Sequence, residues 1–254
     1  MRARTCGVVL LFLGCVMPVL AQKAAEPMEE FSRKNTWTVF AEYSNTSSGI
    51  LLGYTREREL ADLGFGYTRR MFRFRDSTLS YHVELRPVMF ESDPVAISTV
   101  TTAFQESPYG GAFTSTSVYA VVSPCQPSHT TVIYPVIGTP IYVYISNVNC
   151  GRQWTAAQAF SPVGLRYSIR TRHKVQPFGV FTAGYMYSSR PVPVSDAEAF
   201  NYVFDMGAGV EVFGSKRRSL SVECRYHHFS NADSAPANPG TDNMMYKLSY
   251  SFGR

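Results

Sequence analysis

Apolar and polar residues alternate along much of the chain with a period of two, which is the spacing of side chains on the two faces of a β-strand. In one such run near the C-terminus, the apolar positions are Leu220, Val222, Cys224 and Tyr226, and the polar positions are Ser219, Ser221, Glu223 and Arg225. Similar runs cover residues 36–44, 62–71, 79–89, 163–170, 200–213 and 243–252, and the aromatic segment 175–187 alternates poorly. Together they predict an all-β fold with eight antiparallel strands.

Many residues on the polar faces of these strands are charged. They are Glu42, Asp62, His82, Glu84, Arg86, Arg166, Asp205, Glu211, Glu223, Arg225 and Lys247. In a membrane barrel such a face lines the lumen, where acids and bases can pair, and the apolar face meets lipid. The strand length of about ten residues and the even strand number favour an eight-stranded outer-membrane β-barrel. A soluble eight-stranded barrel that binds a small apolar ligand is the alternative.

The connections between the strands alternate in length. Short ones are predicted near residues 72–78, 171–174 and 214–218, and long ones at residues 46–60, 91–156, 188–199 and 230–242. With both termini in the periplasm, the long connections face outward. Segment 91–156 contains its own β-like runs, "VAISTVTTAF" and "TVIYPVIGTPIYVYIS". We therefore expect a strand-bearing extracellular insertion there, with a ten-stranded barrel as the alternative.

The N-terminus has the features of a secretory signal. Arg2 and Arg4 precede a short apolar stretch that ends in small residues at Ala21, which predicts a signal peptide at residues 1–21 and a single barrel domain at 22–254. A lipoprotein anchored at Cys15 is the alternative. Removal of two basic residues from the 24 leaves 22 basic against 19 acidic residues, a net charge of +3. This balance is too mild to indicate nucleic acid as a partner.

Three cysteines remain after such a cleavage. In an oxidising compartment, Cys125 and Cys150 could form a disulfide within the 91–156 insertion. The alternative is that these cysteines, like Cys224, are thiols that only fill space.

The loop before the last strand carries candidate catalytic residues. His228 and Ser230 continue the apolar, outward face of their strand, and residues two apart on one face have Cα atoms about 6–7 Å apart. Asp242 shares the parity of the outward positions in the next strand. A nucleophile, a base and an acid could therefore meet on the outer surface, as acyl transfer requires. The alternative is a polar hairpin tip, because "NPG" is also a good turn sequence. Glu223 is a second candidate for the acid, but its parity directs it into the lumen.

The stretch "HHFSNADSAPANPGTD", followed by a final strand, resembles the C-terminal signature of the lipid A 3-O-deacylases (PagL), also called acyloxyacyl hydrolases. The resemblance extends back through "RPVPVSDAEAFNYVFDMGAGVEVF". It implies an outer-membrane esterase that removes the acyl chain at the 3-position of lipid A, with Ser230 as the nucleophile and His228 as the general base. Asn231, Asn238 and the backbone N–H of Ala232 would shape the oxyanion hole.

The family's acid is usually glutamate, whereas the matching residue here is Asp242. The resemblance suggests no metal or cofactor. The expected partners are lipid A, or lipopolysaccharide, and outer-membrane lipid, and a homodimer is left open. The other function class is a non-enzymatic outer-membrane barrel whose 91–156 insertion binds a partner or stabilises the envelope.

Overall fold

The computed structural model describes residues 31–45, 47, 49–105, 112–135 and 141–254. The predicted signal peptide and Cys15 lie outside these residues. The strands are β1 (Asn35–Ser44), β2 (Glu59–Arg73), β3 (Ser77–Gln105), β4 (Ala112–Val122), β5 (Ser128–Pro135), β6 (Ile141–Ile169), β7 (Val175–Val192), β8 (Glu198–Ser215), β9 (Arg218–Ser230) and β10 (Thr241–Gly253). Within the described ranges, no helix is long and apolar enough to cross a membrane.

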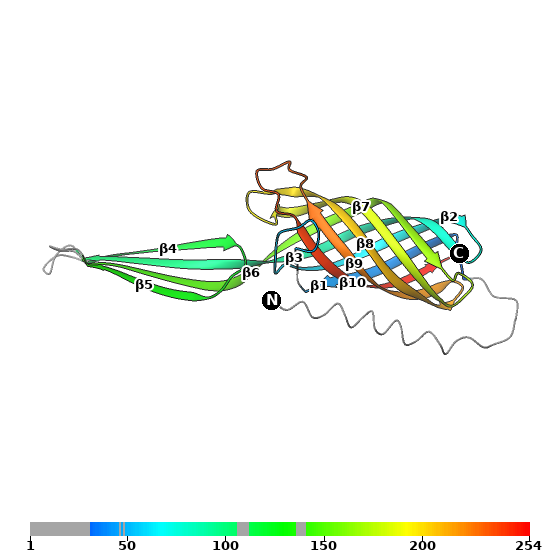
Figure 1. Ribbon diagram of the computed structural model, residues 1–254, viewed down its shortest axis with the longest axis horizontal. Helices are drawn as coiled ribbons and strands as arrows, with labels where there is room; N and C mark the ends of the chain where they lie inside the picture. Colours follow the sequence, from blue (N-terminus) through cyan, green and yellow to red (C-terminus); the bar gives the residue numbers. More distant parts are fainter. Residues whose placement is uncertain (1–30, 46, 48, 106–111, 136–140) are drawn as a thin grey trace.

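Eight strands form a closed antiparallel barrel (Figure 1). The order around the barrel is β1, β2, β3, β6, β7, β8, β9 and β10, and β10 pairs with β1 to close the ring. Closure gives every barrel strand a neighbour on both sides, so no strand edge is left to face lipid. The prediction of an all-β, eight-stranded antiparallel barrel is confirmed.

Strands β3 and β6 are much longer than the barrel needs. Their outer halves leave the barrel side by side and pair with β4 and β5, which gives a four-stranded extension in the order β4-β3-β6-β5. Figure 1 shows it projecting from the end of the barrel opposite the C-terminus. The two β-like runs of the insertion therefore build an extension and not a ten-stranded barrel. A disulfide joins Cys125, in the β4–β5 connection, to Cys150 of β6.

The inward side chains form a charged network that fills the lumen. Arg225 donates two hydrogen bonds to Glu84, at 2.8 and 3.0 Å, and Arg86 bridges Glu84 and Asp205 at 2.9 and 3.2 Å. Buried charges are tolerated only when they are paired in this way. The odd-numbered parity of His227 predicts that it faces the lumen in a network with Glu223 and Arg225. It does face the lumen, but its partner is Asp205, at 2.7 Å, on the neighbouring strand.

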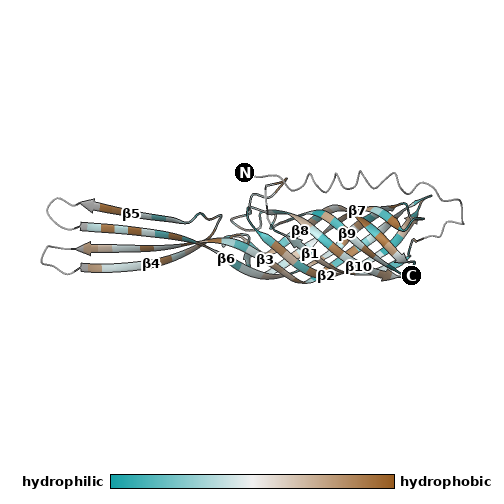
Figure 2. Ribbon diagram, turned by 90° about the horizontal axis from the view of Figure 1, so that it is seen from below, coloured by the Kyte–Doolittle hydropathy of each residue, from teal (hydrophilic) through white to brown (hydrophobic). Residues whose placement is uncertain are grey.

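The outward side chains of the barrel strands are mostly apolar and exposed, and Figure 2 shows the alternation of hydropathy along each strand. One residue departs from the predicted face. The alternation of the run at residues 79–89 places Met89 on the outward face with Leu85, but Met89 is buried in the lumen. The cause is a register irregularity between Arg86 and Met89, which reverses the alternation from Met89 to Glu91.

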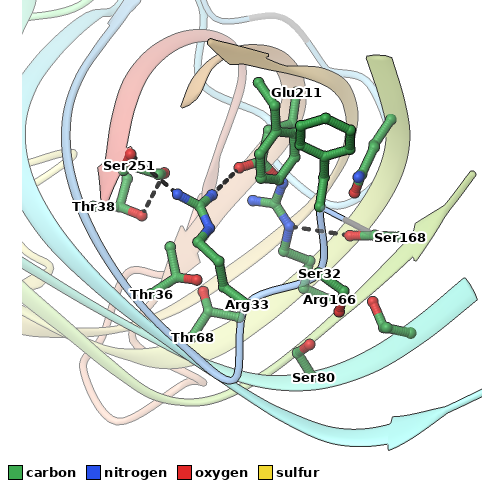
Figure 3. A pocket seen from close by; sticks show the side chains of 14 residues that line it. Ser32, Arg33, Thr36, Thr38, Thr68, Ser80, Arg166, Ser168, Glu211 and Ser251 are labelled. Atoms are coloured by element: carbon green, nitrogen blue, oxygen red, sulfur yellow. Dashed lines mark hydrogen bonds and ion pairs between the residues drawn. The ribbon is translucent and has the colours of Figure 1, made fainter. Parts of the chain in front are cut away.

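The lumen is filled at its other end by the residues just before β1. Arg33 reaches into the barrel, where Arg33 and Arg166 both bind the carboxylate of Glu211 (Figure 3). Phe31 packs against Phe213 beside them in a tilted arrangement, with ring centroids 5.6 Å apart. Charged and aromatic side chains thus occupy the lumen here, so it is a packed interior and not an open channel.

Candidate active site

The C-terminal hairpin brings His228 and Asp242 into contact on the outer surface of the barrel. The two residues are direct cross-strand neighbours in the β9–β10 pairing, so both side chains leave the sheet on the same face. Nδ1 of His228 lies 2.7 Å from Oδ1 of Asp242. This hydrogen bond fixes the imidazole so that Nδ1 carries the proton and Nε2 is left as a base.

The carboxylate of Asp242 is held by four further donors. The backbone N–H groups of Ile50, Leu51 and Leu52, in the β1–β2 loop, all donate to Oδ2, at 3.1, 2.8 and 3.0 Å. The hydroxyl of Tyr226 donates to Oδ1 at 2.7 Å. Asp242 is fully buried as a result. A carboxylate with this many donors is rigid and stays ionised, as an orienting acid requires.

Two glycines permit this close packing. A Cβ atom added to Gly53 would lie 2.6 Å from the backbone nitrogen of Asp242, so no side chain fits between the β1–β2 loop and β10. Gly240 has a φ of +57°, and an added Cβ would lie 3.1 Å from Cε1 of His228. Glycine is therefore needed at both positions, for space at the first and for backbone conformation at the second.

Ser230 is the last residue of β9, two positions beyond His228 on the same outward face. It is only partly exposed and pairs with Tyr202 of β8. No hydrogen bond joins its hydroxyl to His228 or to any other residue that the structure describes. Ser230 thus shares the outward face with His228, and none of the described residues donates a hydrogen bond to its hydroxyl or accepts one from it.

The loop after Ser230 is braced by its own amides. Asn231 donates its backbone N–H to Oδ1 of Asn238, at 3.1 Å, and its side-chain amide to the carbonyl of Ala237, at 2.8 Å. The amide of Asn238 donates to Asp233 at 3.0 Å. Ala232 has a φ of +53°, and none of the described residues accepts a hydrogen bond from its backbone N–H. Of the three expected oxyanion donors, Ala232 alone has its donor unused, whereas both asparagines hold the loop.

The second candidate for the acid does not reach this site. Glu223 points into the lumen, where it accepts a hydrogen bond from Arg225 at 2.7 Å. Cys224 lies on the outward face of β9, opposite Tyr246, and is not in a disulfide. Among the described residues, no group of histidine, cysteine, aspartate and glutamate side chains is arranged to hold a metal ion.

Sequence reasoning missed Tyr226 and the β1–β2 loop as parts of this site. We predicted that Tyr226 would be part of the lipid-facing apolar strip, but only 6% of its surface is exposed, because the loop covers it. Its even-numbered position, which puts it on the same face as His228 and Asp242, was a signal that it belongs to the site. No local pattern could have identified the loop, which lies 190 residues away along the chain.

A model of the family described as lipid A 3-O-deacylase (PagL) matches residues 76–251. The chain belongs to this family. Deacylation of lipid A is the activity for which the family is named, so the protein is placed among the hydrolases, and its apolar outer surface is that of an outer-membrane barrel. The predicted family and location are confirmed, and the match reaches well beyond the C-terminal stretch that carried the resemblance.

Solved structures with similar folds include "the outer membrane enzyme PagL", at a TM-score of 0.47 and 14% identity, with 85% of this chain and 99% of that chain covered. Neisserial surface protein A (NspA) gives a TM-score of 0.38 and 8% identity, with 87% and 97% covered. No curated protein matches the chain. The family assignment rests on the family model and not on these structural similarities.

Proposed function

We propose that the protein hydrolyses the ester-linked acyl chain at the 3-position of lipid A, with Ser230 as nucleophile, His228 as general base and Asp242 as the orienting acid. The observation that carries this proposal is the 2.7 Å hydrogen bond between His228 and Asp242, whose carboxylate is buried and accepts several hydrogen bonds. His228 lies on the same outward face as Ser230. A serine, a histidine and a carboxylate form the unit used for acyl transfer on many folds.

The reaction follows the usual two steps of serine esterases. Nε2 of His228 takes the hydroxyl proton as Oγ of Ser230 attacks the ester carbonyl. The resulting oxyanion accepts a hydrogen bond from the backbone N–H of Ala232, and Asn231 and Asn238 keep that N–H in place. When the tetrahedral intermediate collapses, His228 returns the proton to the departing sugar oxygen. Water then attacks the acyl-serine with His228 again as base, and the fatty acid is released.

The position of the site suits a substrate that lies in the outer leaflet. Ser230 is at the outward-facing end of β9, where it pairs with the exposed Tyr202 of β8. Farther down β9 and β10, the exposed residues are apolar or aromatic: Leu220, Val222, Tyr246 and Leu248. The ester of lipid A lies between its sugars and its hydrocarbon chains, so lateral diffusion brings the ester to the level of Ser230. The acyl chains can then lie against the apolar strip below it.

The test is the variant Ser230→Ala. We expect a folded barrel that has lost about 10⁴-fold or more of its activity, because the members of such a unit act together. Refolded wild type and variant are incubated with lipid A, and the loss of a hydroxyacyl mass is followed by mass spectrometry. Ser195→Ala, an exposed serine in the β7–β8 loop, is the matched control and should keep its activity.

Two results would contradict the proposal. Equal deacylation by wild type and Ser230→Ala would exclude Ser230 as the nucleophile. No deacylation by a folded wild type, with several lipid A forms offered, would favour the non-enzymatic barrel with a role for the extension.

A further inference from the structure

The β1–β2 loop lies over the outward face of the C-terminal hairpin. Tyr226 and Asp242 have the parity of lipid-facing residues, yet the loop leaves them 6% and 0% exposed. The loop is tied to the β9–β10 connection as well, because the backbone N–H of Tyr54 donates to the carbonyl of Pro239 at 2.8 Å. It is therefore a fixed part of the outer surface and not a free extracellular segment.

The large side chains of residues 50–54 in this loop are apolar and exposed. Leu51, Leu52 and Tyr54 are 68%, 59% and 82% exposed, and Ile50 is also exposed. Such a run of large apolar side chains is costly in water and marks an interaction surface. The next exposed residue, Arg56, is charged, so the apolar surface ends within two residues of Tyr54.

The outer leaflet is the partner that fits this surface. The loop covers the upper ends of β9 and β10, and the lipid-facing residues Val222, Tyr246 and Leu248 lie farther down the same two strands. The apolar surface of the loop thus continues the apolar band of the barrel.

We propose that residues 50–54 form a lipid-inserted flap that is part of the active site. Its leucine side chains enter the acyl-chain region of the outer leaflet, and its three backbone N–H groups position Asp242. Insertion into lipid stabilises the loop conformation in which the N–H groups converge on Oδ2. The inference rests on the proposed function, because positioning Asp242 matters for catalysis only if Asp242 orients His228.

The first experiment measures insertion and needs no activity. A cysteine at Leu51→Cys, in a Cys224→Ala background, is labelled with an environment-sensitive fluorophore, and the protein is refolded into phosphatidylcholine vesicles. We expect quenching by a nitroxide on the lipid acyl chain and protection from aqueous iodide. The matched control is Arg56→Cys in the same loop, which should show the opposite pattern. Equal quenching of both labels by iodide would overturn the insertion.

The second experiment tests positioning. In Gly53→Ala, the new Cβ would lie 2.6 Å from a backbone atom of Asp242, where ordinary contacts begin at 3.4 Å, so the loop must move by roughly 1 Å. A displacement of that size at a catalytic group costs about a hundredfold in kcat. KM should change little, because the leucine side chains still face lipid. Gly214→Ala is the matched control, since an added Cβ there meets no atom within 4 Å.

A second positioning variant protects the test against misfolding. Leu51→Pro removes the backbone N–H that lies 2.8 Å from Oδ2 and leaves Gly53 intact. We expect kcat to fall in this variant as well. Unchanged kcat in a folded Gly53→Ala or Leu51→Pro barrel would overturn the positioning role. Failure of the proposed function would instead appear as normal activity in Ser230→Ala, whatever the depth of the loop.

Discussion

Asp242→Asn is the most informative change at the proposed site because it removes one charge and almost no volume. The carboxylate accepts three hydrogen bonds at Oδ2, from the β1–β2 loop, and two at Oδ1, from Tyr226 and His228. The amide of asparagine can keep the three loop bonds only if its oxygen replaces Oδ2. Its NH₂ group then replaces Oδ1 and faces His228.

This orientation gives His228 the wrong tautomer. An NH₂ group donates to Nδ1, so the imidazole proton moves to Nε2, which can then no longer accept the proton of Ser230. The equivalent aspartate-to-asparagine change in a serine protease lowers kcat by about 10⁴. A similar factor here corresponds to roughly 5.4 kcal/mol in the activation barrier, at about 1.36 kcal/mol for each tenfold. The free energy of unfolding should fall by only about 1–3 kcal/mol, since most of the bonds to the side chain are kept.

The assay compares deacylation rates of refolded wild type and variant on lipid A by mass spectrometry, with heat-modifiable gel mobility as the check of folding. Glu223→Gln is the matched control, because that carboxylate lies on the lumen side of the same hairpin and binds Arg225. We expect it to disturb lumen pairing and folding more than turnover. The reasoning is wrong if Asp242→Asn keeps activity within about tenfold of wild type, or if a folded Glu223→Gln barrel is the inactive one.

Three further predictions can be checked with the same preparations. Tyr226→Phe removes one of the two hydrogen bonds to Oδ1 of Asp242 and should lower kcat by about tenfold, because the lost bond joins a neutral donor to a charged acceptor. Unchanged kcat would show that Tyr226 contributes only packing. Replacing residues 98–148 by an Asn-Gly turn, together with Cys150→Ser, should leave deacylation intact, because β3 and β6 lie across the barrel from the site. Loss of activity in a folded protein would show that the extension acts in catalysis. The full chain should fractionate with the outer membrane and migrate differently when heated, as closed barrels do, and recovery without detergent from the periplasm would contradict the architecture.

The sequence by itself determined which strands exist and which way their side chains point. A strand alternates its side chains between two faces because of its own backbone geometry. The local pattern is therefore enough to place Glu223 on the lumen face and Asp242 on the outward face. The same parity predicted that His228, Ser230 and Asp242 face outward and that His227 faces the lumen. Their catalytic roles remain predictions. The alternation failed at Met89, because the register irregularity before it depends on the pairing of β3 with β6 and not on β3 alone.

Only the tertiary structure decided which distant groups meet. Closure of the barrel places β1 next to β10, and this brings the β1–β2 loop over Asp242, 190 to 192 residues away in sequence. The same closure covers Tyr226, which the alternation alone predicted to face lipid. The partner of His227 is set by the register of β9 on β8, which places Asp205 opposite it. Periodicity is set by a residue and its immediate neighbours, whereas the partners of a buried carboxylate are set by the register of strands around the whole ring.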